Sequence, residues 1–213
     1  TSFWCCGNRG CRDNRAFKKA VDWELIKENP VDKADRPKLL KGEMDIWSKE
    51  EIEKFLRAAL ESEPISHFMF FYLAIYTGAR KGELIALQWD DWDEANATIR
   101  INKNLANIRN KGKVIKTTKT ISSNRVIGLS QKNNEDIKRY KEEQDESKQQ
   151  AGNTWNPQNL MLINREGTYI DDRNILRVMD RVCKQSGVKN ITIHGLRHTH
   201  ASLLIDAGID VVK

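Results

Sequence analysis

The sequence of 213 residues contains no long apolar run and only four cysteines. A membrane-spanning helix needs about 20 consecutive apolar residues, and the first residues do not resemble a secretory signal. Cys5, Cys6 and Cys11 crowd the beginning while Cys183 stands alone, which is neither a disulfide framework nor a paired zinc pattern. We therefore expect a soluble cytoplasmic protein without membrane contact.

Acidic residues are missing from one long stretch of the chain. Overall, 36 basic and 30 acidic residues give a formal charge of +6, yet no Asp or Glu occurs between Glu94 and Glu135. A run of one charge sign on expected strands favours a nucleic acid partner over the alternative, a solvated charged face. We predict that the basic residues contacting the polyanion are Arg100, Lys103, Arg109, Lys111, Lys113, Lys116 and Arg125.

The chain divides into a short first part and one larger domain. Residues 1–13 match no pattern and stay unassigned, with disorder as one explanation. Apolar residues at helical spacing predict a helix over 14–28, which an Asn-Pro pair would end, and the polar segment 31–45 is predicted to be a linker. Residues 46–213 are expected to form the main domain.

Periodicity within the main domain predicts a mainly α protein with a small antiparallel β-sheet. Ser48 and Glu51 form a capping box that opens the first helix, and 65–76 is apolar nearly all round, so it should cross the core. Charged composition predicts an exposed helix over 131–150, and helical spacing of apolar residues predicts an amphipathic helix over 171–186. In the last helix we expect a buried stripe of Leu196, His200, Leu203, Leu204 and Ala207.

The sheet is predicted from short alternating runs separated by turn residues. These runs occupy residues 98–101, 114–116 and 125–127. We expect one antiparallel sheet, with Lys119 at or near the turn between its last two strands.

Two short segments carry arginines at helical spacing with other polar groups. His194 lies three residues before Arg197, and Arg80 lies three residues before Glu83, and residues three apart share one face of a helix. A guanidinium is a rigid fork of donors that matches two phosphate oxygens, and two such forks can neutralise the charge on a pentavalent phosphorus. A lone motif of this kind is usually structural, but several together indicate a phosphate clamp.

These segments resemble the boxes of a known family. TGARKGEL at 77–84 with LQWDD at 87–91, and IHGLRHTHAS at 193–202, closely resemble the two boxes of the tyrosine recombinases, the integrases of phages and conjugative transposons. KTISSNRVI at 119–127 resembles the β-hairpin of that family. The resemblance covers the chain from Asn14 to its end. It implies the tyrosine recombinase catalytic-domain fold, that is, the DNA breaking-rejoining fold, preceded by the end of the core-binding domain and a linker over 14–45.

The resemblance implies a role for each matching position. Arg80 and Arg197 would hold the scissile phosphate, and Lys119 would protonate the leaving 5′ oxygen. His194 would hydrogen-bond the phosphate or assist proton transfer, and Glu83 would orient its neighbours. The resemblance further implies site-specific recombination by two transesterifications, with double-stranded DNA as partner and no metal or other cofactor. It also implies association with the nucleoid and a homo-oligomer on DNA, which is a tetramer in the family.

Some of these residues have simpler interpretations. Lys119 has Lys113 and Lys116 as neighbours, and most hairpin lysines are only solvated. His200 falls on the apolar stripe and is expected to be a hydrogen-bonded core histidine. A metal pair of His194 and His198 lacks a third, carboxylate ligand nearby.

The nucleophile of the family is a tyrosine beyond the helix that carries Arg197. The tyrosines of this chain, Tyr72, Tyr76, Tyr140 and Tyr169, all precede that helix. We therefore expect the chain to bind a phosphodiester but to lack the nucleophile, with Tyr140, on an exposed helix, as the least unsuitable substitute.

Two functions remain open on these observations. One is the catalytic domain of a recombinase, and the other is a DNA-binding module or relic that kept the phosphate clamp without the chemistry. A metal-dependent nuclease is a distant third, because it would need clustered carboxylates. The acidic residues Asp90, Asp91, Asp93 and Glu94 have no obvious partners in the sequence.

Overall fold

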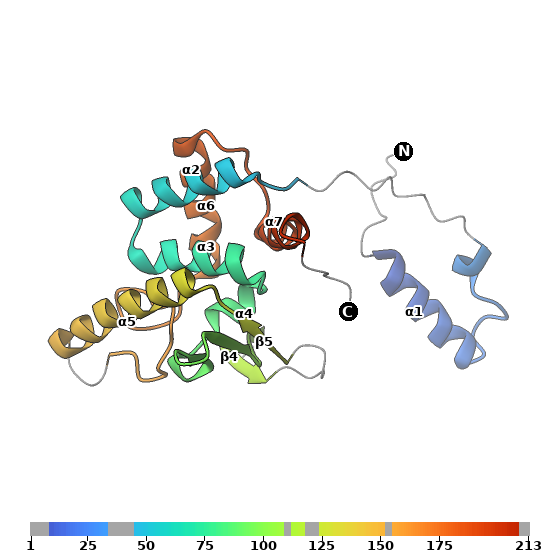
Figure 1. The fold of residues 1–213 in the computed structure, drawn as a ribbon. Helices are drawn as coiled ribbons and strands as arrows, with labels where there is room; N and C mark the ends of the chain where they lie inside the picture. Colours follow the sequence, from blue (N-terminus) through green and yellow to red (C-terminus); the bar gives the residue numbers. More distant parts are fainter. Residues whose placement is uncertain (1–8, 34–44, 109–111, 118–123, 152–154, 209–213) are drawn as a thin grey trace. The chain divides into compact units, whose positions relative to one another are not determined.

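The computed structural model describes residues 9–33, 45–108, 112–117, 124–151 and 155–208. The chain forms two compact units, Thr1–Glu43 and Met44–Lys213. Figure 1 shows the elements of each unit. In the described part of the chain, no helix combines the length and apolar character that crossing a membrane requires.

The first unit contains the helix α1, Arg9–Asp22, and the short 3-10 helix η1, Pro30–Lys33. The helix predicted over 14–28 is therefore wrong at both ends. The chain turns after Asp22 because Glu24 adopts a left-handed conformation with φ 58°. Leu25, one of the apolar residues whose spacing predicted the longer helix, lies beyond α1 and is 71% exposed. The predicted linker falls largely on residues 34–44, which lie outside the described residues.

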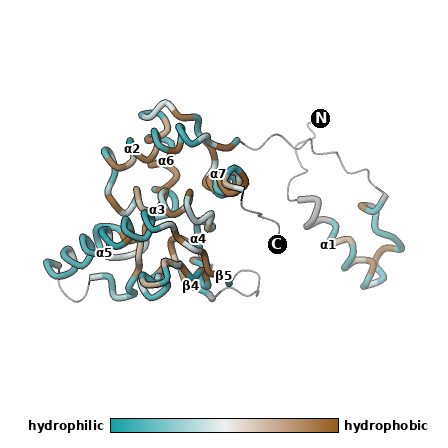
Figure 2. Tube along the Cα trace, in the orientation of Figure 1, coloured by the Kyte–Doolittle hydropathy of each residue, from teal (hydrophilic) through white to brown (hydrophobic). Residues whose placement is uncertain are grey.

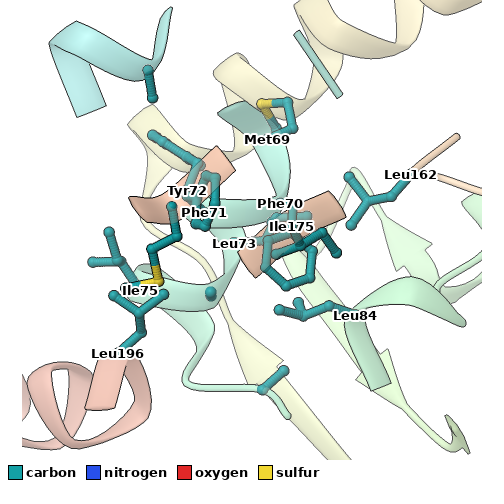
Figure 3. Packing of buried hydrophobic residues seen from close by; sticks show 14 of the residues in the cluster. Met69, Phe70, Phe71, Tyr72, Leu73, Ile75, Leu84, Leu162, Ile175 and Leu196 are labelled. Carbon is teal, nitrogen blue, oxygen red and sulfur yellow. The ribbon is translucent and has the colours of Figure 1, made fainter. Parts of the chain in front are cut away.

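The helices of the second unit surround the central helix α3, Ile65–Thr77. Phe70, Phe71 and Leu73 have no exposed surface, which confirms the prediction of a helix that crosses the core (Figure 3). Full burial of one such side chain contributes roughly 1.5–3 kcal/mol. Around α3 pack the helices α2 (Lys49–Ser62), α4 (Lys81–Ile85) and α7 (Ile193–Asp206), while α6 (Asp172–Ser186) packs on α2.

The start of α2 is fixed by the predicted capping box. The Ser48 backbone N–H donates to Glu51 Oε2 at 2.8 Å, and the Glu51 N–H donates to Ser48 Oγ at 3.3 Å. The preceding residue, Trp47, is buried, and its backbone N–H donates to Thr199 Oγ1 at 3.1 Å. Because Thr199 lies on α7, this bond joins the start of the domain to α7.

In the described part of the chain the strands form two sheets and not the single predicted one. β1 (Trp92–Asp93), β2 (Thr98–Ile101) and β5 (Arg125–Gly128) form an antiparallel sheet in the order β1-β2-β5. β3 (Lys103–Ile108) and β4 (Gly112–Thr117) form a separate hairpin. The sequence pattern missed β3, and it did not show that β5 pairs with β2.

Helix α5, Gln131–Ala151, has one buried face and is therefore not the fully exposed helix that was predicted. Its sequence is largely hydrophilic (Figure 2). Ile137 and Tyr140 are nevertheless in the core, and Gln144 is a buried polar residue. The Trp89 Nε1–H donates to Gln144 Oε1 at 2.7 Å, so the side-chain amide of Gln144 provides the hydrogen-bond acceptor for the buried indole N–H. The expectation of an exposed Tyr140 is wrong, because sparse apolar residues on a polar helix are sufficient to anchor it.

Glycines with positive φ follow the last two described helices, as the sequence predicted. α6 stops at Gly187, which has φ 70°, and α7 is followed by Gly208 at φ 73°. Leu196 is fully buried against the core, and Figure 3 shows it close to Ile75 of α3. His200, Leu203 and Leu204 are only half-buried and Ala207 is exposed, so Leu196 alone of the predicted stripe of α7 is fully buried.

Candidate active site

The site is built around a tight turn at the end of α3. Gly78 has φ 58° and ψ 20°, and its N–H donates to the Ala74 carbonyl at 3.1 Å. The left-handed conformation suits glycine because no Cβ is present to clash. The turn leads directly to Arg80, the N-cap residue of α4. Arg80 is thus held between two helices, and its side chain remains 55% exposed.

Glu83 is the buried centre of the polar network. Its side chain is 3% exposed, and its two oxygens accept three hydrogen bonds. Oε2 accepts from the Arg80 backbone N–H at 2.9 Å and from Arg125 Nη2 at 2.8 Å, while Oε1 accepts from Arg80 Nη1 at 2.9 Å. One carboxylate therefore joins the first arginine box to strand β5.

Helix α7 brings the second arginine to the same turn. The hydroxyl of Thr192 accepts from the Gly195 N–H at 3.0 Å and caps the helix start. One turn further along, Arg197 Nη1 donates to the Gly78 carbonyl at 2.7 Å. This carbonyl lies two residues before Arg80 in the chain. The two arginine boxes, which are far apart in sequence, therefore meet at one turn.

His200 fixes the same junction from α7. Its Nδ1 lies 2.9 Å from the Ile75 carbonyl, and because a carbonyl only accepts, Nδ1 carries the proton. A Cβ added to Gly78 would lie 2.5 Å from His200 Cδ2, so the ring covers the glycine. The expected hydrogen bond is present, but the His200 side chain is half-buried and does not belong to the buried core.

The electrostatics of the network follow from its burial and composition. Burial works to raise the pKa of Glu83, but hydrogen bonds from Arg125 and Arg80 outweigh it and hold that pKa below its ordinary value. Burial lowers the pKa of Arg197, as do the nearby charges of Arg125 and Arg80, while Glu83 opposes them. Three guanidinium groups thus act on one carboxylate, which leaves an excess of positive charge suited to an anion.

His194 is exposed at the start of α7. Its ring meets the ring of His198 edge-on, with centroids 4.7 Å apart. Both histidines line a hollow of about 510 Å³ together with Asp45 and Thr192. The contacts of His194 are thus separate from the network that joins the arginines to Glu83. Among the described residues there is no group of three or more His, Cys, Asp or Glu able to hold a metal ion.

The basic residues predicted to contact DNA have different surroundings. Arg100 and Lys116 are exposed. Lys103 Nζ instead bonds both oxygens of the buried Asp91, at 2.7 and 2.8 Å, and Lys113 Nζ lies 3.5 Å from Asp171 Oδ1. Arg109, Lys111 and Lys119 lie outside the described residues. The sequence assigned Arg125 to DNA contact, and no local signal indicated its bond to Glu83.

The tyrosines are placed in or against the core. The Tyr140 hydroxyl donates to the Met161 carbonyl at 2.9 Å, and the Tyr72 hydroxyl donates to Asp136 Oδ2 at 2.6 Å. Burial raises the pKa of both phenols. A nucleophilic tyrosine must reach a phosphorus atom with its hydroxyl oxygen. Tyr140 is therefore unsuited to that role.

Comparison with known proteins decides the family. A family model described as the phage integrase family matches residues 46–213. The chain belongs to this family. It is 30% identical to the ICEBs1 integrase of Bacillus subtilis over 199 residues, covering 93% of this chain and 53% of that protein. It is 27% identical to a XerC-like tyrosine recombinase of Caldanaerobacter subterraneus, covering 91% of this chain and 53% of that protein. The chain thus spans about half the length of the curated relatives it matches.

Solved structures share the fold of this chain. The Tn1549 transposon integrase in complex with a circular intermediate DNA matches with a TM-score of 0.78 at 20% identity, covering 99% of this chain and 69% of that chain. A lambda integrase dimer bound to a core site matches with a TM-score of 0.60 at 22% identity, covering 94% of this chain and 66% of that chain. The tyrosine recombinase catalytic-domain fold, mainly α with little sheet, is confirmed.

Proposed function

We propose that the chain carries the phosphate-binding site of a site-specific DNA recombinase of the integrase type. The observation that supports this most is the meeting of Arg80 and Arg197 at the Gly78 turn. Each guanidinium uses one N–H on the protein through an observed bond and has further donors for an anion. Double-stranded DNA supplies such anions, and relatives of the same family have been solved on DNA.

In the proposed reaction a tyrosine hydroxyl attacks the phosphorus while the bond to the 5′ oxygen breaks. The tyrosine loses its proton, the 5′ oxygen gains one, and a 3′-phosphotyrosyl ester forms. Arg80 and Arg197 stabilise the charge on the pentavalent phosphorus. Lys119 is assigned the proton transfer to the 5′ oxygen and His194 a bond to the phosphate or a part in proton transfer, while Glu83 orients Arg80.

The tyrosyl ester conserves the energy of the broken bond, so a 5′ hydroxyl can rejoin the strand by the reverse step. This chemistry requires no metal or nucleotide. Recombination between two duplexes involves four strands, so we further propose that the protein acts as a homo-oligomer on DNA, a tetramer as the family resemblance implies. Exposed Arg100 and Lys116 are assigned to phosphates outside the site.

The test uses two proteins, this chain and the full protein encoded by the reading frame that contains it. Each is incubated with a nicked duplex that releases a short 5′ fragment after cleavage. We expect both proteins to bind duplex DNA in a salt-dependent way, and the full protein to form a covalent adduct that survives denaturation. Binding without an adduct from either protein would favour the DNA-binding module. Absence of salt-dependent binding would contradict both functions.

A further inference from the structure

The side chain of Arg125 points into the protein, although the sequence grouped it with DNA-contacting residues. Arg125 begins β5 and pairs with the buried Ile101 of β2. The next residue, Val126, pairs with the exposed Arg100 and is itself 63% exposed. Because neighbouring residues of a strand point to opposite faces, Arg125 lies on the inner face. Its side chain is 26% exposed, about half the value of Arg80.

The inward direction brings Arg125 to a carboxylate that is already shared. Glu83 Oε2 accepts from Arg125 Nη2 and from the Arg80 backbone N–H, while Oε1 accepts from the Arg80 side chain. A buried carboxylate with a single guanidinium partner would form a neutral pair and attract that guanidinium inward. The guanidinium of Arg125 is a second partner of the same carboxylate. One negative charge then cannot neutralise both arginines, so Arg80 keeps net positive charge on its solvent-exposed side.

We propose that Arg125 is a positioning residue for the phosphate site, which acts by holding Glu83 and thereby Arg80, and that it does not itself bind a DNA phosphate. This inference rests on the proposed function, because it assumes that Arg80 binds DNA. It assigns to β5 a part in the site that neither the basic run nor the arginine boxes indicate.

The experiment measures binding of duplex DNA to this chain by fluorescence anisotropy at several salt concentrations. Each phosphate contact contributes about 0.9 to the slope of log K against log salt concentration. The variants are Arg80→Gln, Arg125→Gln and the double variant, with Arg100→Gln alone and combined with Arg80→Gln as the matched control. Arg100 is a fair control because it is the same residue type on the adjacent strand, on the exposed face.

We expect Arg80→Gln to reduce the slope by about 0.9 and Arg125→Gln to reduce it by a similar amount. Once Arg80 is replaced, the additional Arg125→Gln change should have no further effect, because Arg125 acts through Arg80. The control pair should be additive. A purely structural role of Arg125 would lower the melting temperature and leave the slope of the folded protein unchanged.

The inference is overturned if Arg125→Gln has the same salt slope and affinity as the wild type. It is also overturned if the slope of the double variant is smaller than that of Arg80→Gln by about another 0.9. It fails separately from the proposed function. That function fails if the wild type shows no salt-dependent binding or if Arg80→Gln has no effect. Should Arg125→Gln not fold, the comparison is made with Glu83→Gln present in every protein, so that no buried carboxylate loses its partner. With Glu83→Gln present throughout, an additional loss of slope on adding Arg125→Gln to Arg80→Gln would overturn the inference. No additional loss would support it.

Discussion

Arg197 Nη1 donates a hydrogen bond of 2.7 Å to the backbone carbonyl of Gly78, across 119 positions of sequence. The carbonyl belongs to the C-terminal end of α3, where the helix dipole favours a cation. The bond therefore anchors α7 to the turn that delivers Arg80. The proposal that both guanidinium groups bind one anion rests on this bond.

Replacement of Gly78 by alanine tests the packing of this turn. An L-residue in the left-handed region costs roughly 1–2 kcal/mol, and here the new Cβ would also lie 2.5 Å from His200 Cδ2. Gly187 is the matched control, because it has a similar φ of 70° but nothing within 4 Å of an added Cβ. We expect Gly78→Ala to lower the free energy of unfolding more than Gly187→Ala in urea denaturation. Equal losses would show that the contact with His200 is unimportant.

The pH dependence of stability tests the environment of His200. Burial lowers its pKa, the hydrogen bond to Ile75 opposes this, and the charges of Arg197 and Arg125 lower it further, with a net decrease. The unfolded chain therefore binds more protons just below the ordinary pKa of about 6.5. The stability that depends on neutral His200 is complete above this pH and is lost as the pH falls toward the folded pKa.

Urea unfolding of the wild type and of His200→Gln above and below pH 6.5, the ordinary value, measures this effect. We expect the wild type to lose more free energy of unfolding on acidification than the variant. Identical losses in the two proteins would contradict the assigned environment of His200.

The local features of the fold could be predicted from the sequence because each depends on neighbouring residues. The capping box of Ser48 and Glu51, the apolar helix α3 and the turn at Gly78 are of this kind. The exposure of Leu25 and the burial of Tyr140 depend on which elements pack together, and no periodicity shows that. For the same reason the sequence found both arginine boxes and did not predict that Arg125 reaches Glu83.

Two lysines from the basic run should behave differently. Lys103 is a charged partner of the buried Asp91, which also accepts from the Gln88 N–H. Lys103→Gln should lower the free energy of unfolding by roughly 1.5–3 kcal/mol through loss of a hydrogen bond between charged groups. Its effect on the salt dependence of DNA binding should be small. Lys116 is exposed, so Lys116→Gln should leave stability unchanged and reduce the salt slope by about 0.9. The reverse pattern in denaturation and binding experiments would contradict these assignments.

Tyr140 should be a structural residue. Its buried hydroxyl donates to the Met161 carbonyl, which also accepts from Gln144 Nε2. Tyr140→Phe therefore removes one hydrogen bond without leaving this acceptor unsatisfied, and it should lower the free energy of unfolding by roughly 0.5–1.5 kcal/mol. We expect this chain to form no covalent adduct on a nicked duplex, with or without the substitution. An adduct mapped to Tyr140 by mass spectrometry would refute this placement.

The convergence of Arg80 and Arg197 is tested most directly by strand cleavage in the full protein encoded by the reading frame. Arg80→Ala and Arg197→Ala are compared with Arg181→Ala, whose guanidinium is paired with Glu63. We predict that each clamp variant forms the covalent adduct at least about 100-fold more slowly while keeping much of its DNA binding, and that Arg181→Ala cleaves normally. Normal cleavage by either clamp variant would contradict the account.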